Sequence, residues 1–184
     1  MIDRAKQVGA IVIIDEAYHY FYPNTFIEHA LQDGNVVVLR TFSKLFSIAA
    51  CRLGVIIGSP EIIHYVKNAR LTFDANAIAL LFAERILDHP ELVEELIRIE
   101  KEGKAYTLEE LRKKGYECRD CRGNFIFVKP RHDAKEITER LEKEKQGLVH
   151  AYGNELLKEY IRVSVGSKKA MQIFLDAFFE VDAE

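Results

Sequence analysis

The sequence predicts an α/β fold over its first half and a smaller α+β module over its second half. Continuous β-branched runs alternate with helical patterns up to about residue 88, and strand–crossover–strand order is typical of α/β proteins. After the break at His89-Pro90 the pattern changes to a long charged helix, followed by short strands and helices. We therefore expect two domains, residues 1–88 and 89–184.

The first half begins with runs that read as strands buried on both faces, the parallel-sheet type. Gly9 and Asp15 bound the first run, and the turn signal Asp33-Gly34-Asn35 precedes the second. The predicted elements are strands at residues 10–14, 36–39 and 53–57, a short helix at 25–31, a helix that starts at Ser59-Pro60 and a helix at 74–87.

The helix at 74–87 is apolar on nearly every side. A helix without a polar face is expected to be buried, either in a core or against a partner.

The second half opens with a long amphipathic helix at 91–114, which Gly115 ends. Strict alternation over 160–165 predicts a strand with Arg162 and Ser164 on the face opposite its valines. The remaining elements are a strand at 124–128, a helix at 134–145 and a closing helix at 167–181. The predicted apolar face of that closing helix comprises Ala170, Ile173, Phe174, Ala177, Phe178 and Val181.

Composition places the chain among ordinary globular proteins. Of its 184 residues 48% are hydrophobic and 30% charged, and the formal net charge is −3, which argues against nucleic acid or an anionic membrane as a partner. No apolar run approaches the roughly 20 residues of a membrane span, and the start shows no signal-peptide pattern. Three cysteines are too few for a disulfide framework, so we expect a reducing cytoplasm.

One lysine carries the chemical signal of the sequence. Lys44 ends the motif Arg40-Thr-Phe-Ser-Lys44 just after a predicted strand, Arg52 follows eight residues later, and Asp15-Glu-Ala-Tyr18 lies upstream. An amine with lowered pKa attacks aldehydes, a carboxylate holds a pyridine nitrogen protonated, and hydroxyls with a guanidinium bind phosphate. Those are the groups that pyridoxal phosphate (PLP) requires of a protein.

These motifs resemble the fold-type I, class I/II PLP-dependent aminotransferases, most closely the histidinol-phosphate aminotransferase branch. The resemblance covers roughly the C-terminal half of such an enzyme, and implies the end of its mostly parallel large domain followed by its small α+β domain. It implies that Lys44 is catalytic, forming a C=N bond with the coenzyme and moving the substrate proton. It assigns coenzyme binding to Asp15, Tyr18, Thr41, Ser43, Lys44 and Arg52.

Two residues of the second half match the family near the substrate. In the resembling family the arginine of Arg162-Val-Ser-Val-Gly binds a substrate carboxylate or a phosphate, although an arginine on a strand is otherwise an exposed edge residue. Asn124-Phe125 matches a strand start that lies near the substrate in the resembling family, and a turn asparagine before a strand explains it equally well.

The chain also departs from the family. Between lysine and arginine the family usually has a glycine, and here the stretch reads Ser47-Ile-Ala-Ala-Cys51. If that loop requires a positive φ, an alanine there costs energy. The loop at 71–76 lacks the usual proline. The family's first half supplies a glycine-rich turn, a stacking aromatic and an asparagine that have no counterpart in these residues.

The expected function is transamination between an amino acid or amine and a 2-oxo acid in amino-acid biosynthesis, by a cytoplasmic homodimer. A PLP-dependent decarboxylase of the same family shows the same motifs, and a non-catalytic fragment or interaction module is the alternative from another class. No metal site is expected, because Cys118-Arg-Asp-Cys121 lacks a second ligand pair.

Overall fold

A computed structural model describes residues 1–22, 24–72 and 74–183 of the chain. It divides into two compact units, Met1–Glu94 and Glu95–Glu184, and each is described by itself. The division lies inside helix α5 (Pro90–Lys113), a little after the boundary predicted at residue 88. The assignment of these units as domains stays a prediction.

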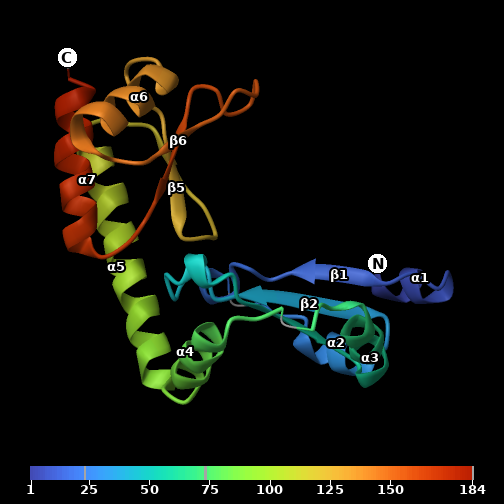
Figure 1. Cartoon of the computed structure of the whole chain (residues 1–184). Helices are drawn as coiled ribbons and strands as arrows, with labels where there is room; N and C mark the ends of the chain where they lie inside the picture. The colour runs from blue at the N-terminus through green and yellow to red at the C-terminus, as the bar shows by residue number, and fades with distance from the viewer. Residues whose placement is uncertain (23, 73, 184) are drawn as a thin grey trace. The chain divides into compact units, whose positions relative to one another are not determined.

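The first unit follows the predicted order of elements closely (Figure 1). Its helices and strands are α1 (Ile2–Gln7), β1 (Val12–Asp15), the 3-10 helix η1 (His19–Phe21), α2 (Ile27–Gln32), β2 (Val36–Thr41), the 3-10 helix η2 (Ala49–Cys51), β3 (Gly54–Gly58), α3 (Pro60–Ala69) and α4 (Ala77–Leu87).

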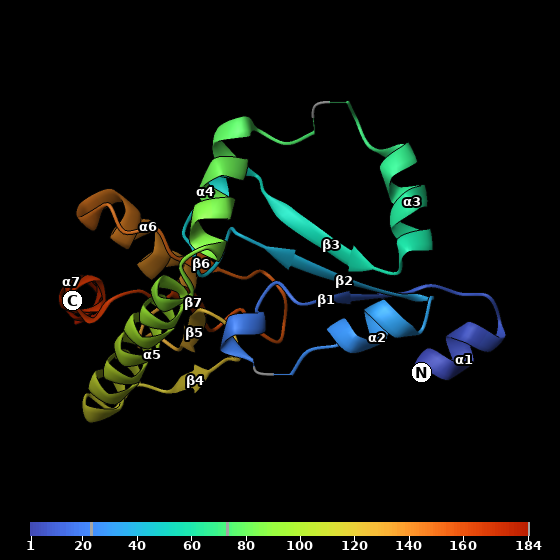
Figure 2. The same cartoon turned by 90° about the horizontal axis from the view of Figure 1, so that it is seen from below.

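The described part of this unit contains a sheet with strand order β1-β2-β3, seen from below in Figure 2. β1 and β2 are parallel, as predicted, with Asp15 beside Leu39. β3 is antiparallel to β2, with Gly54 beside Thr41, so this portion of the predicted α/β fold has a mixed sheet. The reason is the connection at residues 42–53, whose only helix is the three-residue η2, whereas a parallel crossover usually needs a long helix.

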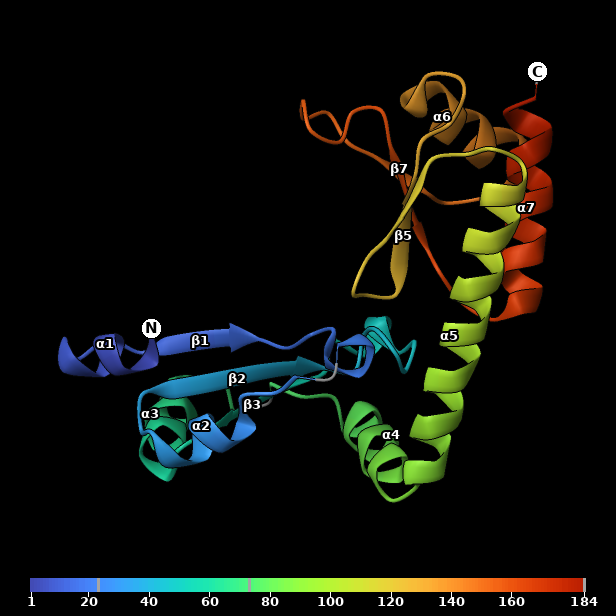
Figure 3. The same ribbon diagram turned by 180° about the vertical axis from the view of Figure 1, so that it is seen from behind.

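Helix α2 covers one face of this sheet. It lies against the sheet in Figures 1 and 3, and on that face Val36, Val38 and Ala30 are fully buried and Ile14 packs against them. On the opposite face Ile13 is 66% exposed. The prediction of a strand buried on both faces is therefore wrong for β1 within the described chain, because alternate side chains point to opposite faces.

Helix starts in this unit obey local capping rules. Ser59 caps α3 by accepting a hydrogen bond from the Ile62 N–H, with Pro60 at the first helical position, as predicted. The side chain of Asn76 caps α4.

In α4 only Ala79 and Ala83 are buried, while Ile78, Leu81 and Phe82 are more than half exposed, so the predicted burial of this helix is not met within the described chain.

The second unit is an antiparallel sheet packed against helices. Its elements are the C-terminal part of α5, then β4 (Cys118–Asp120), β5 (Phe125–Val128), α6 (Ala134–Lys145), β6 (His150–Ala151), β7 (Ile161–Ser164) and α7 (Lys168–Val181). The strand order is β4-β5-β7-β6.

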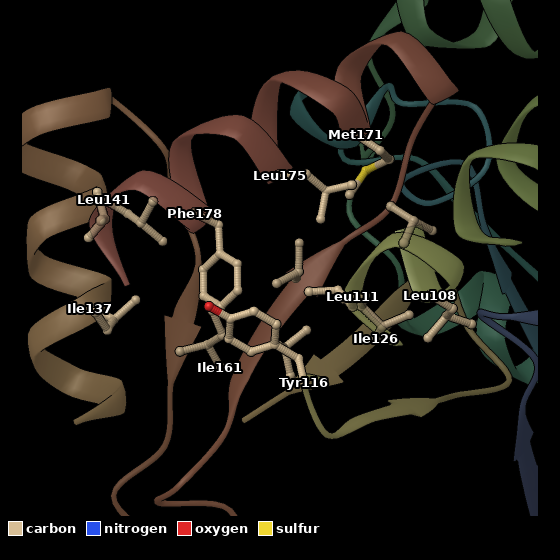
Figure 4. Close-up of a cluster of buried hydrophobic side chains, with 14 of the residues drawn as sticks. Leu108, Leu111, Tyr116, Ile126, Ile137, Leu141, Ile161, Met171, Leu175 and Phe178 are labelled. Carbon is tan, nitrogen blue, oxygen red and sulfur yellow. The ribbon is translucent and has the colours of Figure 1, made fainter. Parts of the chain in front are cut away.

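The core of this unit lies between the sheet and the three helices (Figure 4). Ile161 and Val163 are buried and Arg162 is not, which confirms the alternation predicted for β7. The buried face of α7 is partly different from the prediction, because Met171 and Leu175 point into the core while Ile173 is 65% exposed.

No helix of the described chain combines the length and apolarity that crossing a bilayer requires.

A close backbone approach fixes α5 against the start of α7. A Cβ added to Gly103 would lie 1.8 Å from the carbonyl oxygen of Gly166. We expect Gly103→Ala to lower the free energy of unfolding by about 3 kcal/mol, because the clash is with backbone. Urea denaturation measures it. Gly166→Ala is the matched control, since its Cβ would meet only the Ala170 methyl at 3.9 Å, and equal losses in both variants would contradict the account.

Candidate active site

The three strands of the first unit bring the predicted coenzyme residues to one edge of the sheet. Asp15 ends β1 and Thr41 ends β2, and carboxyl ends of parallel strands meet at the same edge. Because β3 runs antiparallel, its first residue Gly54 lies beside Thr41, and Arg52 therefore precedes the strand at that same edge. Residues far apart in the sequence thus converge through strand direction alone.

Lys44 lies on the loop that follows β2, and it contacts Tyr18. Its Nζ is 5.4 Å from the centroid of the Tyr18 ring, within the range of a cation–π contact. The loop is held by apolar neighbours of the lysine, since Phe42, Leu45 and Phe46 are buried. The pattern of aromatic and aliphatic residues around Lys44 therefore anchors the backbone, and Lys44 itself is half-buried.

The hydroxyl of Thr41 organises the beginning of this loop. It donates to the carbonyl of Leu53 and accepts from the N–H of Ser43 at 3.1 Å. The Asp15 carboxylate makes a similar local turn, accepting from the Ala17 N–H at 2.9 Å. Both side chains therefore have defined positions, and Asp15 itself is exposed.

The loop between Lys44 and Arg52 does use positive φ angles, but not at its alanines. Ser47 has φ 56° and Arg52 has φ 52°. The Arg52 side chain is exposed, and its guanidinium donates to the carbonyl of Ala49 at 3.1 Å. Ser47 therefore adopts the left-handed backbone conformation for which the family's glycine would be suited.

Sequence reasoning missed a cluster next to this edge of the sheet, formed by Glu16, Arg40 and Thr25. The buried carboxylate of Glu16 accepts from Nε and Nη2 of Arg40, at 3.1 and 2.9 Å, and from the hydroxyl of Thr25 at 3.0 Å. Its other oxygen accepts from the N–H of Phe26 at 2.6 Å. The sequence did contain a signal for this cluster. Glu16 directly follows Asp15 and Arg40 directly precedes Thr41, so a charged residue adjoins a predicted site residue at the end of each strand.

The electrostatics of this cluster favour a charged Glu16. Burial raises the pKa of Glu16, but hydrogen bonds from the Phe26 N–H, Arg40 and Thr25 outweigh it, and the net pKa is lowered. The pKa of the neighbouring His19 is lowered by burial and by the charge of Arg40. The carboxylate is therefore neutralised by the guanidinium rather than by the imidazole.

The predicted substrate residues belong to the second unit. Arg162 on β7 is half-buried, and its Cζ lies 4.1 Å from the centroid of the Phe125 ring. The carbonyl of Asn124 accepts from the N–H of Val165 at 2.9 Å, so Asn124 joins the end of the β5–β7 pairing. The aromatic face holds the guanidinium on the side of the sheet away from the core.

A lysine, a phenol, a carboxylate, two hydroxyls and a guanidinium at one sheet edge fit the functional groups of pyridoxal phosphate. The family model for aminotransferase class I and II matches residues 1–178. The chain belongs to this family.

Individual relatives refine this membership. The histidinol-phosphate aminotransferase of Thermotoga maritima is 33% identical over 175 residues, covering 95% of this chain and 50% of the relative. That of Citrifermentans bemidjiense is 33% identical over 180 residues, covering 97% of this chain and 51% of the relative. The chain therefore spans about half the length of the curated relatives it matches.

Solved structures agree on the fold. Histidinol-phosphate aminotransferase from Sinorhizobium meliloti in complex with pyridoxal-5'-phosphate superposes with a TM-score of 0.84 at 23% identity, covering 94% of this chain and 49% of that one. L-threonine-O-3-phosphate decarboxylase from Porphyromonas gingivalis gives a TM-score of 0.75 at 20% identity, covering 94% and 55%. At such identities the likeness shows the fold alone.

The positive φ of Ser47 leads to a stability prediction. We expect Ser47→Gly to raise the free energy of unfolding by about 1 kcal/mol, because glycine adopts φ 56° without a Cβ clash. Thermal unfolding measures the gain. The control is Ala49→Gly in η2, where the same glycine should be neutral or destabilising, and stabilisation by both variants would contradict the assignment.

The Glu16 carboxylate leads to a pH prediction. At pH 7 we expect Glu16→Gln to lower the free energy of unfolding by about 2–3 kcal/mol, since Arg40 loses its charged partner. Because the folded pKa is below the ordinary 4.5, the contribution is complete above that value and disappears as the pH falls through the folded pKa. Urea titrations at pH 7 and pH 3 measure the difference.

For this experiment Glu28→Gln, on an exposed face of α2, is the matched control and should change stability little at either pH. A Glu16→Gln penalty that persists undiminished at pH 3 would contradict the proposed charge state.

Proposed function

We propose that this chain supplies the lysine-bearing part of the active site of a PLP-dependent aminotransferase of the histidinol-phosphate aminotransferase type. The reaction exchanges an amino group between an amino acid or amine and a 2-oxo acid. The observation that carries the proposal is the convergence of Lys44, Tyr18 and Asp15 at one sheet edge, with Nζ of Lys44 5.4 Å from the Tyr18 ring centroid. Family membership supports it.

Each residue at this edge has a role that its chemistry explains. When bound, pyridoxal phosphate supplies an aldehyde that condenses with an amine and a ring that accepts electrons from the substrate carbon. The carboxylate of Asp15 would keep the ring nitrogen protonated, and the phenol of Tyr18 would donate to the ring oxygen. Thr41, Ser43 and Arg52 would hold the phosphate, because a planar guanidinium can form two hydrogen bonds to it.

Lys44 has two tasks. Its Nζ would hold the coenzyme through the aldehyde carbon until a substrate amine takes its place. The freed Nζ would then accept the proton from the substrate Cα and give it back, acting first as base and then as acid. In the second unit we assign the binding of the substrate's acidic group to the guanidinium of Arg162. Asn124 is the other proposed substrate residue, at the end of the β5–β7 pairing opposite Val165.

The partners follow from the same chemistry. We propose that the partners are small molecules, an amino acid or amine and a 2-oxo acid, and that the protein is a cytoplasmic homodimer without a nucleic-acid or membrane partner. The homodimer rests on analogy with the family.

A decarboxylase is the second candidate, because decarboxylases are among the solved structures that share this fold. The curated relatives above 30% identity cited here are histidinol-phosphate aminotransferases, which favours transamination. Carbon dioxide release during turnover discriminates between the two reactions.

The direct test is chemical trapping at Lys44. The chain is incubated with excess pyridoxal phosphate and reduced with borohydride, which converts the C=N bond into a stable secondary amine. Peptide mass spectrometry then maps the label. We expect Lys44 to be labelled preferentially and Lys44→Ala to lose that label, with binding weak because the chain spans half the length of its curated relatives.

The matched control is Lys67→Ala, which removes an exposed lysine of α3 and should leave the labelling of Lys44 unchanged. Uniform labelling of many lysines, without preference for position 44, would overturn the proposal.

A further inference from the structure

The Glu16–Arg40 ion pair lies on the opposite face of the sheet from Asp15 and Thr41. The N–H of Glu16 donates to the carbonyl of Leu39 at 2.8 Å, which continues the β1–β2 register and sets Glu16 beside Arg40. Both side chains are on the face that α2 covers, because Ile14 and Val38, two residues earlier on each strand, pack in the core on that face.

Each strand end therefore carries one residue of the pair and one residue of the candidate site. Asp15 precedes Glu16 and Thr41 follows Arg40, and their side chains alternate to the face opposite α2. A strand end cannot turn or shift on one face without moving its neighbour on the other. The ion pair thus constrains the separation between Asp15 and the loop that begins at Thr41.

The same carboxylate also closes the segment that carries Tyr18. Glu16 stands at the beginning of that segment, and its two oxygens accept from the hydroxyl of Thr25 and the N–H of Phe26 at the end. Arg40 donates to the same Thr25 hydroxyl at 2.9 Å. One cluster therefore ties together the Tyr18 segment, the end of β1 and the end of β2.

We propose that Glu16 and Arg40 are positioning residues for the coenzyme site on the other face of the sheet. The inference rests on the proposed function and adds to it two residues that act through Asp15 and Thr41. An ion pair kept only for stability is often replaceable by apolar residues at little cost. The placement of this pair, directly behind Asp15 and Thr41, gives it a geometric task instead.

The test compares Glu16→Gln and Arg40→Met with the unmodified chain in two measurements. The first is the pyridoxal phosphate concentration that half-labels Lys44 under borohydride. The second is the pH at which the visible absorbance of the Lys44–coenzyme linkage changes. We expect the first to rise roughly tenfold, since small misplacements are costly, and the second to shift by about half a pH unit as the distances to Asp15 and Tyr18 change.

Two further variants separate positioning from stability. Asn35 joins the other end of the same strand pair, donating to the carbonyls of Ile2 and Ala10, so Asn35→Ala should lower the melting temperature without altering either measurement. Arg40→Lys keeps the positive charge but loses the contact of two guanidinium nitrogens with Glu16. Both measurements for this variant should lie between those of the unmodified chain and those of Arg40→Met. If Glu16→Gln unfolds the chain, Thr25→Val is used in its place. This variant removes the hydroxyl that bonds both Glu16 and Arg40.

The outcomes are distinguishable. If the unmodified chain does not label Lys44 preferentially, the proposed function fails and this inference fails with it. If the unmodified chain labels Lys44 and the two variants match it, or change no more than Asn35→Ala does, the proposed function stands and the positioning role is overturned.

Discussion

The parallel pairing of β1 with β2 is the constraint on which the candidate site depends. Its register sets Asp15 beside Leu39, so both strands end at the same edge with their last side chains on one face. The antiparallel β3 then returns the chain to that edge, where Gly54 lies beside Thr41. A Cβ at Gly54 would be 2.9 Å from the carbonyl oxygen of Arg40. The start of β3 therefore packs too closely against β2 to accept a side chain at this position without a shift.

In the second unit the corresponding constraint is the alternation of β7. Its apolar residues face the helices and pack around Phe178, while Arg162 is held on the other face against the Phe125 ring. Since the core needs Ile161 and Val163 inside, a slip of one residue would bury the guanidinium. Core packing and the direction of Arg162 are therefore set by the same interaction.

Sequence reasoning succeeded where the determinants are local. The β-branched runs, the Ser59-Pro60 helix start and the alternation at 160–165 each depend on neighbours within a few residues. It failed where distant partners decide. The Glu16–Arg40 pair joins residues 24 positions apart, and the direction of β3 depends on how the loop at 42–53 folds. The left-handed Ser47 was missed because serine carries no signal for it.

The central claim is that one edge of the first unit is a coenzyme-binding surface. Amide nuclear magnetic resonance of the isotope-labelled chain, titrated with pyridoxal phosphate, tests it directly. The account predicts that the largest shift changes cluster at residues 15–18, 41–47 and 52, the segments that meet at this edge. Changes that centre elsewhere in the chain, with those segments unmoved, would contradict it.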